Sequence, residues 1–220
     1  MNRKDETIKK EVVDQLYWDN RVDADDVTVH VDNGVVTLKG TVPTHGARSS
    51  AVTDTWMIDG VTSVEDQIDV ELAPTVEIPT DAEIRNNIQN ILSWNTDIDV
   101  MDIDVSVEGG VVTLEGTVDE YWKKWKAVEL VSDVSGVIDV LDEMTVVPTG
   151  SFIDKDIAET INDALDRNLY IDAEDITVEV EHGKVTLTGV VPTNFVRSKA
   201  GDIASYTAGV IDVHNNLVVG

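Results

Sequence analysis

The 220-residue chain contains no cysteine, which excludes disulfide bonds, thiolate zinc sites and a cysteine nucleophile. Basic residues are also scarce: 16 Lys and Arg stand against 43 Asp and Glu, and the formal net charge is −27. Such a surface repels phosphate backbones, so we do not expect a nucleic-acid partner. The chain has no run of about 18 apolar residues, and this excludes a membrane-spanning helix.

Apolar residues make up 42% of the chain and recur with regular periods, which indicates folded domains rather than disorder. The segment from Met1 to Lys10 is charged and lacks the apolar stretch of a secretory signal peptide. We therefore expect a cytoplasmic chain, or a periplasmic one if this is a mature form whose signal peptide has been removed.

One motif occurs three times along the chain. The segment GVVTLKG at residues 34–40 recurs as GVVTLEG at 110–116 and as GKVTLTG at 183–189. In every copy an aspartate lies 29 residues before the first glycine, and a further glycine lies 20 residues after the second. These residues are Asp5, Asp81 and Asp154, and Gly60, Gly136 and Gly209. The fixed distances predict three tandem repeats. We place them at 1–72, 80–147 and 152–220, joined by short linkers at 73–79 and 148–151.

Each repeat opens with apolar residues spaced by four, which place one apolar stripe along a helix. In the first repeat these residues are Ile8, Val12 and Leu16. Polar residues at the start of the equivalent helices are expected to be N-caps or first-turn acids, namely Thr80, Asp81 and Asp154.

The rest of the repeat reads as two strands, a helix and a last strand. Val27, Val29 and Val31 alternate with polar residues, which predicts a half-buried strand. Asn-Gly at residues 33–34 predicts a hairpin turn, because both positions accept a positive φ, and a second strand follows over 35–42. The second helix carries Ala47, Ala51, Thr55 and Ile58, with Gly60 as its C-cap, and the last strand covers residues 61–72.

The predicted fold class is α+β, with three small domains of the order helix, strand, strand, helix, strand. Each domain has a three-stranded mixed sheet that two helices cover on one face. The polar residues of the two hairpin strands face water on the other side, namely Thr28, His30, Thr37 and Lys39.

A helix, alternating valines, the pattern G-x-V-x-L-x-G and a helix followed by Gly-Val together resemble the BON domain family. The resemblance covers all three repeats and rests on Val36, Leu38, Val61, their counterparts and nine glycines. These glycines, which we expect to be structural, are Gly34, Gly40, Gly60, Gly110, Gly116, Gly136, Gly183, Gly189 and Gly209. The resemblance implies a non-enzymatic protein that binds phospholipid or envelope components and acts in osmotic stress or outer-membrane integrity.

The sequence offers no convergent set of catalytic residues. The four histidines are His30, His45, His182 and His214, and no two occupy the same position in different repeats. We therefore predict no catalytic triad, no histidine metal site and no cofactor. Acidic clusters at residues 23–26, 97–104 and 172–175 offer oxygen ligands for Ca²⁺, but they lack the spacing of an EF-hand loop, and we interpret them as solvated carboxylates.

One segment of the second repeat departs from the shared pattern. Tyr121, Trp122, Lys123, Trp125 and Lys126 open its second helix, and Trp125 aligns with serine in both other repeats. Tryptophan and lysine together suit a lipid headgroup interface or a protein partner. The alternative is that the tryptophans pack in a seam between repeats. Phe195 gives the third repeat a weaker version of the same site.

Two functional hypotheses follow from these observations. The first is a non-enzymatic, stress- or envelope-related binding protein that attaches to phospholipid headgroups or a protein partner through the second helix of the second repeat. The alternative is a soluble acidic protein, adapted to salt or binding cations such as potassium or calcium, without membrane contact. A bias toward Asp over Glu, 28 to 15, favours the alternative.

Overall fold

The computed structural model describes residues 4–22, 26–72, 77–96, 98 and 102–220. Backbone contacts divide the chain into two compact units. The first unit comprises Met1–Trp94, Val105–Leu114 and Val128–Leu141, and the second comprises Asn95–Asp104, Glu115–Ala127 and Asp142–Gly220. The first repeat therefore lies within the first unit and the third repeat within the second, while the middle repeat contributes to both.

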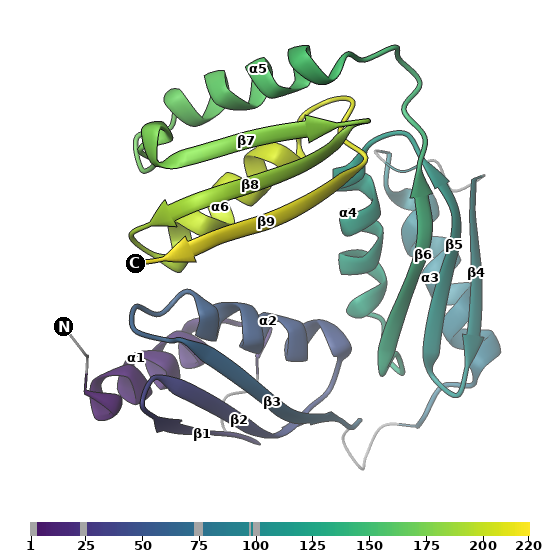
Figure 1. Ribbon diagram of the computed structural model, residues 1–220. Coiled ribbons are helices and arrows are strands. Elements are labelled where there is room, and N and C mark those ends of the chain that lie inside the picture. Colours follow the sequence, from purple (N-terminus) through teal and green to yellow (C-terminus); the bar gives the residue numbers. More distant parts are fainter. Residues whose placement is uncertain (1–3, 23–25, 73–76, 97, 99–101) are drawn as a thin grey trace. The chain divides into compact units, whose positions relative to one another are not determined.

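The predicted order of elements is present in all three repeats (Figure 1). The first repeat contains α1 (Asp5–Trp18), β1 (Val27–Asp32), β2 (Val35–Val42), α2 (His45–Trp56) and β3 (Ser63–Val70). The middle repeat contains α3 (Asp81–Trp94), β4 (Ile103–Glu108), β5 (Val111–Val118), α4 (Tyr121–Ser132) and β6 (Asp139–Val146). The third contains α5 (Asp154–Asp166), the short 3₁₀ helix η3 (Ala173–Asp175), β7 (Ile176–Glu181), β8 (Lys184–Val191), α6 (Asn194–Ser205) and β9 (Asp212–Val219).

Each repeat forms its own three-stranded mixed sheet, which confirms the predicted fold class. In the first repeat β2 lies in the centre, antiparallel to β1 and parallel to β3. The third repeat has the same arrangement around β8. The helix between the second and third strands makes the parallel crossover, and it packs beside the opening helix on one face of the sheet (Figure 1).

Apolar side chains at helical and strand periods form the core of each repeat. The helix stripe Ile8, Val12 and Leu16 is at most 1% exposed, and it packs against Val36 and Leu38 of β2. The third repeat buries Ile157, Ile161, Leu165, Val185 and Leu187 in the same pattern. On the opposite sheet face Thr28 and His30 are exposed. The sequence periods therefore assign the buried and the solvated faces correctly.

A carboxylate at the first position of each opening helix binds the hairpin turn of its own repeat. In the first repeat the backbone N–H groups of Asn33 and Gly34 donate to Asp5 over 3.0 and 3.2 Å. The same pair of bonds joins Asp81 to Gly109 and Gly110 (2.9 and 3.0 Å), and Asp154 to His182 and Gly183 (2.7 and 2.8 Å). We call this interaction the aspartate clamp.

The aspartate clamp explains the constant spacing of 29 residues between the aspartate and the glycine. Hydrogen bonds from Gly183 and His182 hold the pKa of Asp154 below its ordinary value, because they favour the ionised form. In the middle repeat Asp81 binds the turn, and the N-terminus of α3 is capped by the preceding residue, Thr80. The Thr80 hydroxyl accepts a hydrogen bond from the N–H of Glu83, and the Glu83 carboxylate accepts one from the N–H of Thr80, as in a capping box.

The first glycine of each G-x-V-x-L-x-G motif lies in the hairpin turn, where both its backbone conformation and its neighbours restrict it. Gly34 has a φ of +81°, and its carbonyl accepts a hydrogen bond from the N–H of Thr62 over 2.9 Å. In the middle repeat a Cβ added at Gly110 would lie 2.7 Å from the carbonyl oxygen of Gly136. These positions therefore exclude any side chain, by backbone conformation and by space.

The expected C-cap at Gly60 is wrong. Helix α2 ends at Trp56 with Met57 as its C-cap. The chain then makes a further turn, in which the N–H of Val61 donates to the carbonyl of Ile58 over 3.2 Å. Gly60 has a φ of +90° in this turn, and its carbonyl packs against Gly34. The glycine thus serves the approach of this turn to the hairpin rather than the end of the helix.

The two turn positions of the middle repeat give a matched test. We expect Gly110→Ala to lower the free energy of unfolding by about 2–4 kcal/mol, because it adds a clash to an unfavourable φ. We expect Gly109→Asn to have little effect, because Asn33 and His182 occupy this position elsewhere with φ of +51° and +52°. Urea denaturation followed by circular dichroism measures the stability of both variants. Equal losses of stability would contradict the conclusion that only Gly110 excludes a side chain.

Candidate binding surface

The aromatic residues at the start of α4 differ in exposure. Tyr121 packs partly buried against the core of the third repeat, and both lie in the second compact unit. In the same unit, the ring of Trp122 stacks on Tyr206, with centroids 5.7 Å apart and an interplanar angle of 16°. Trp125 is 53% exposed. Of the three aromatic residues predicted for this site, Trp125 is therefore the one most available to a partner.

The lysines of α4 lie beside acidic groups of the same chain. Lys123 Nζ is 2.7 Å from an oxygen of Asp119, and Lys124 Nζ is 3.4 Å from Asp142. The ion pair with Lys123 lowers the pKa of Asp119. Lys123 also lies over the ring of Trp122, with 5.7 Å from Nζ to the centroid. The positive charge that the sequence suggests is thus largely compensated locally, and the indole rings distinguish this surface.

Phe195 of α6 occupies the position of Trp122 in the third repeat and is 40% exposed. Its ring meets the ring of Tyr170 edge to face, with centroids 5.6 Å apart. Phe195 therefore packs on an aromatic residue of its own repeat, whereas Trp122 packs on Tyr206 of the neighbouring one.

His45 lies between a serine and an aspartate within the first compact unit. Its Nδ1 is 3.1 Å from Ser132 Oγ, and its Nε2 is 3.4 Å from an Asp139 oxygen. However, Ser132 is only 5% exposed, and its hydroxyl donates to the carbonyl of Val128 over 2.7 Å. A nucleophilic serine needs an accessible oxygen and a proton shared with the histidine. The cluster therefore lacks the geometry of a catalytic triad, and burial lowers the pKa of His45.

The acidic cluster of the third repeat has a local structural role. Asp172 precedes η3, and its carboxylate accepts a hydrogen bond from the N–H of Glu174 over 3.3 Å. The two other clusters fall partly outside the described residues, at 23–25, 97 and 99–101. Among the residues that the structure describes, no three His, Asp or Glu side chains are placed to hold a metal ion.

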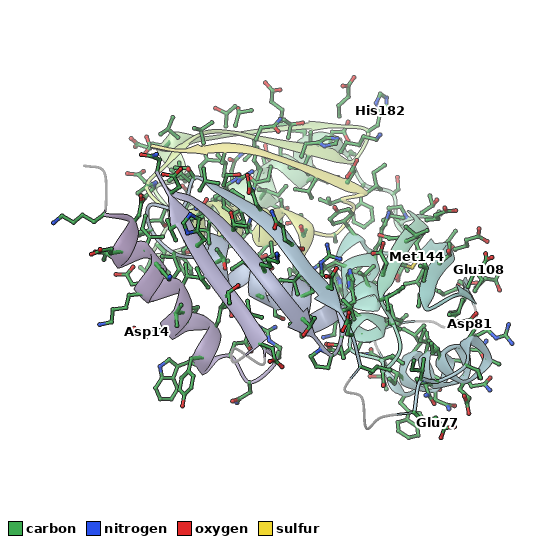
Figure 2. All side chains as sticks on the ribbon, turned by 90° about the horizontal axis from the view of Figure 1, so that it is seen from below. Asp14, Glu77, Asp81, Glu108, Met144 and His182 are labelled. Atoms are coloured by element: carbon green, nitrogen blue, oxygen red, sulfur yellow. The ribbon has the colours of Figure 1, made fainter. Side chains whose placement is uncertain are left out.

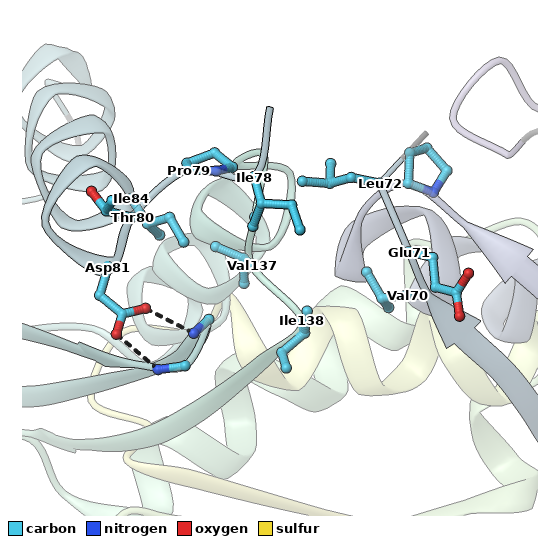
Figure 3. Close-up of a pocket in the computed structure, with 14 residues that line it drawn as sticks. Val70, Glu71, Leu72, Ile78, Pro79, Thr80, Asp81, Ile84, Val137 and Ile138 are labelled. Carbon is cyan, nitrogen blue, oxygen red and sulfur yellow. Dashed lines mark hydrogen bonds between the residues drawn. The ribbon is translucent and has the colours of Figure 1, made fainter. Parts of the chain in front are cut away.

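A cavity of about 680 Å³ lies at the N-terminal end of α3, within the first compact unit (Figure 3). Val70, Leu72, Ile84 and Ile138 contribute apolar walls. Asp81 also lines the cavity, but its two oxygens accept the aspartate-clamp hydrogen bonds drawn in Figure 3. An equivalent cavity of about 620 Å³ in the second unit is lined by Asp154, Ile157, Gly183, Gly209 and Ile211, among others. Both cavities offer mainly apolar surface.

The pattern of one family matches the chain three times, at residues 4–71, 80–148 and 153–220. The chain belongs to the BON domain family. Over 143 residues it is 28% identical to osmotically-inducible protein Y of Escherichia coli strain K12, covering 64% of this chain and 71% of that protein.

Two solved structures of CdsD, a structural protein of the type III secretion system of Chlamydia trachomatis, align with 97% and 96% of the chain. They cover 91% and 96% of the CdsD chains, at 15% and 16% identity and a TM-score of 0.27. A TM-score this low supports no inference from CdsD to the overall arrangement or the function of this chain.

Two exposed tryptophans were not predicted from the sequence. Trp18 ends α1 of the first BON domain and is 78% exposed, and Trp94 ends α3 of the second and is 83% exposed. Both lie two residues beyond the last core residue of the helix, Leu16 or Leu92, at aligned positions. The sequence does contain a sign of this exposure. In two repeats a tryptophan lies off the apolar stripe of the helix, where the core does not need it.

No helix among the described residues of the three BON domains is both long and apolar enough to cross a membrane.

The different environments of Trp122 and Trp125 predict different effects on stability. We expect Trp122→Ala to lower the free energy of unfolding by about 1–2 kcal/mol, because it loses the Tyr206 ring and the hydrogen bond from Nε1 to Glu120. Trp125→Ala should change stability by less than about 0.5 kcal/mol. Urea denaturation compares the two variants. A larger loss in Trp125→Ala would show that Trp125 is the packed residue.

Proposed function

We propose that the chain is a non-enzymatic binding protein of three BON domains that acts in osmotic stress at the cell envelope. The relationship to osmotically-inducible protein Y supports the stress-related role. The triplicated family match supports a modular binding protein, since it covers most of the chain with one kind of domain.

The second BON domain attaches to phospholipid headgroups through α4. The observation that carries this proposal is the half-exposed indole of Trp125, at a position where the other two domains have Ser49 and Ser198. An indole ring is favourable at the boundary between headgroups and acyl chains. Because Lys123 and Lys124 are paired with carboxylates, the indole contributes more than the ammonium groups do. The net charge of −27 opposes attachment to anionic lipid.

Vesicle co-sedimentation tests this attachment. We expect the chain to pellet with phosphatidylcholine vesicles, and less with vesicles that also contain phosphatidylglycerol at low salt. Trp125→Ala should weaken binding about five- to tenfold, because it removes the exposed anchor. Val190→Ala, which truncates a side chain of similar exposure on β8, is the control and should bind as the wild type does. If the wild-type chain does not bind the vesicles, or if Trp125→Ala binds them equally well, lipid attachment through α4 is rejected. A protein partner then remains as the ligand of α4.

A second candidate function is that of an acidic protein adapted to salt. Its support is that acidic residues outnumber basic ones in every BON domain, with exposed examples such as Asp14 and Glu108 (Figure 2). Carboxylates at this density repel one another at low ionic strength and are relieved by cations.

This candidate predicts that the melting temperature rises by roughly 5–10 °C between low salt and molar KCl. Choline chloride at the same ionic strength is the control, because it screens charge without offering a small cation to the carboxylates. A larger rise in KCl supports direct cation binding by the surface, and a flat response to both salts would reject salt adaptation.

A further inference from the structure

The first BON domain buries a carboxyl group where the other two domains have aliphatic residues. Asp54 lies in α2 and is 8% exposed, and its aligned residues are Leu130 and Ile203. Its Oδ2 atom is buried and receives no hydrogen bond. A buried acceptor without a donor is costly, and burial of an ionised carboxylate is more costly still. The position therefore requires a compensating group.

The neighbour of Asp54 is a second carboxyl group, that of Asp19. Asp19 caps the C-terminal end of α1, and its side chain is only 10% exposed. It too is particular to the first domain, because its aligned residues are Asn95 and Asn168. The carboxyl groups of Asp19 and Asp54 lie within hydrogen-bonding reach of each other. Two carboxylates only accept, so such a bond forms only when one of them carries a proton.

The surrounding charges decide which of the two groups holds the proton. Arg21 binds both oxygens of Asp19, with Nε 3.0 Å from Oδ1 and Nη2 2.6 Å from Oδ2. The bonds from Arg21 lower the pKa of Asp19 to about 2, whereas burial and the Asp19 charge raise the pKa of Asp54 to about 6. Gln15 of α1 also bonds to Asp54, and Asp133 acts on Arg21. Asp54 is therefore the proton carrier.

We propose that Asp54 and Asp19 form a proton-binding site that joins α2 to the end of α1, and that loss of the proton loosens this joint in the first domain. The proton sits on Asp54 and is donated to Asp19, whose charge Arg21 compensates. When Asp54 ionises, the hydrogen bond is replaced by repulsion between two largely buried carboxylates. The exposed Tyr17 and Trp18 directly precede Asp19, so the joint lies beside the aromatic end of α1.

The direction of the pH effect follows from the raised pKa. Asp54 binds its proton more tightly in the folded domain than in the unfolded chain, so its contribution to stability is full below its ordinary pKa of 3.8. That contribution is lost as the pH rises through about 6. Burial lowers the pKa of His45, so the stability that His45 contributes is lost as the pH falls, which is the opposite direction, and a test has to separate the two groups.

Carbon-13 NMR of the full chain measures the two carboxyl groups directly. We expect the Asp54 carboxyl to titrate near pH 6 and the Asp19 carboxyl near pH 2. An Asp54 midpoint near the ordinary value of 3.8 would overturn the proposal, whatever the variants do.

Amide hydrogen exchange, corrected for the intrinsic rate, measures the joint itself. We expect protection at Val12 and Ala51, relative to Ile161 and Ala200 of the third domain, to fall by between about 10-fold and 100-fold from pH 4.5 to pH 7.5. Asp54→Leu, which copies Leu130, and Asp54→Asn should abolish this fall and leave the opposite effect of His45. The same pH dependence in wild type and Asp54→Leu would show that the pair is not a proton site.

Discussion

The fold of each repeat depends on one carboxylate that binds the hairpin turn from the start of the opening helix. This aspartate clamp joins the start of the opening helix to the hairpin turn of the sheet. Its carboxylate accepts hydrogen bonds from two backbone N–H groups of a turn whose residues have positive φ. Once the turn is fixed, its glycine carbonyl accepts a hydrogen bond from the residue directly before the third strand. The helix, the hairpin and the parallel strand therefore meet at one glycine, which explains why a few residues recur at fixed distances while most of the sequence varies.

Much of this architecture was predictable, because periodicity and repetition report on burial. The spacing of Ile8, Val12 and Leu16, and the alternation of Val27, Val29 and Val31, determine which faces are apolar. The clamp was visible only as a constant distance between aspartate and glycine, since a spacing does not say which atoms meet. Gly60 was misassigned for the same reason: glycine after a helix is typical of a C-cap, whereas here its carbonyl approaches a turn that is distant in sequence.

The candidate site was less predictable than the fold. The sequence identifies the unusual composition of α4, but not that Trp122 stacks on Tyr206 or that Lys123 pairs with Asp119. These partners lie outside the local pattern, so the division between packed and exposed aromatic residues emerges only in three dimensions. The sequence alone does not single out Asp54, because one more acid in an acidic chain is ordinary. Its burial, together with its aliphatic counterparts in the other domains, distinguishes it.

The acidity of the chain also affects the edges of its sheets. A sheet of three strands has two edges, and an edge strand presents backbone groups that can pair with another molecule. The edge strands here carry acids, including Glu65 and Asp69 on β3 and Glu143 on β6. Like charges brought together by edge-to-edge pairing would repel. The negative charge of these strands therefore disfavours pairing between the sheets of neighbouring molecules.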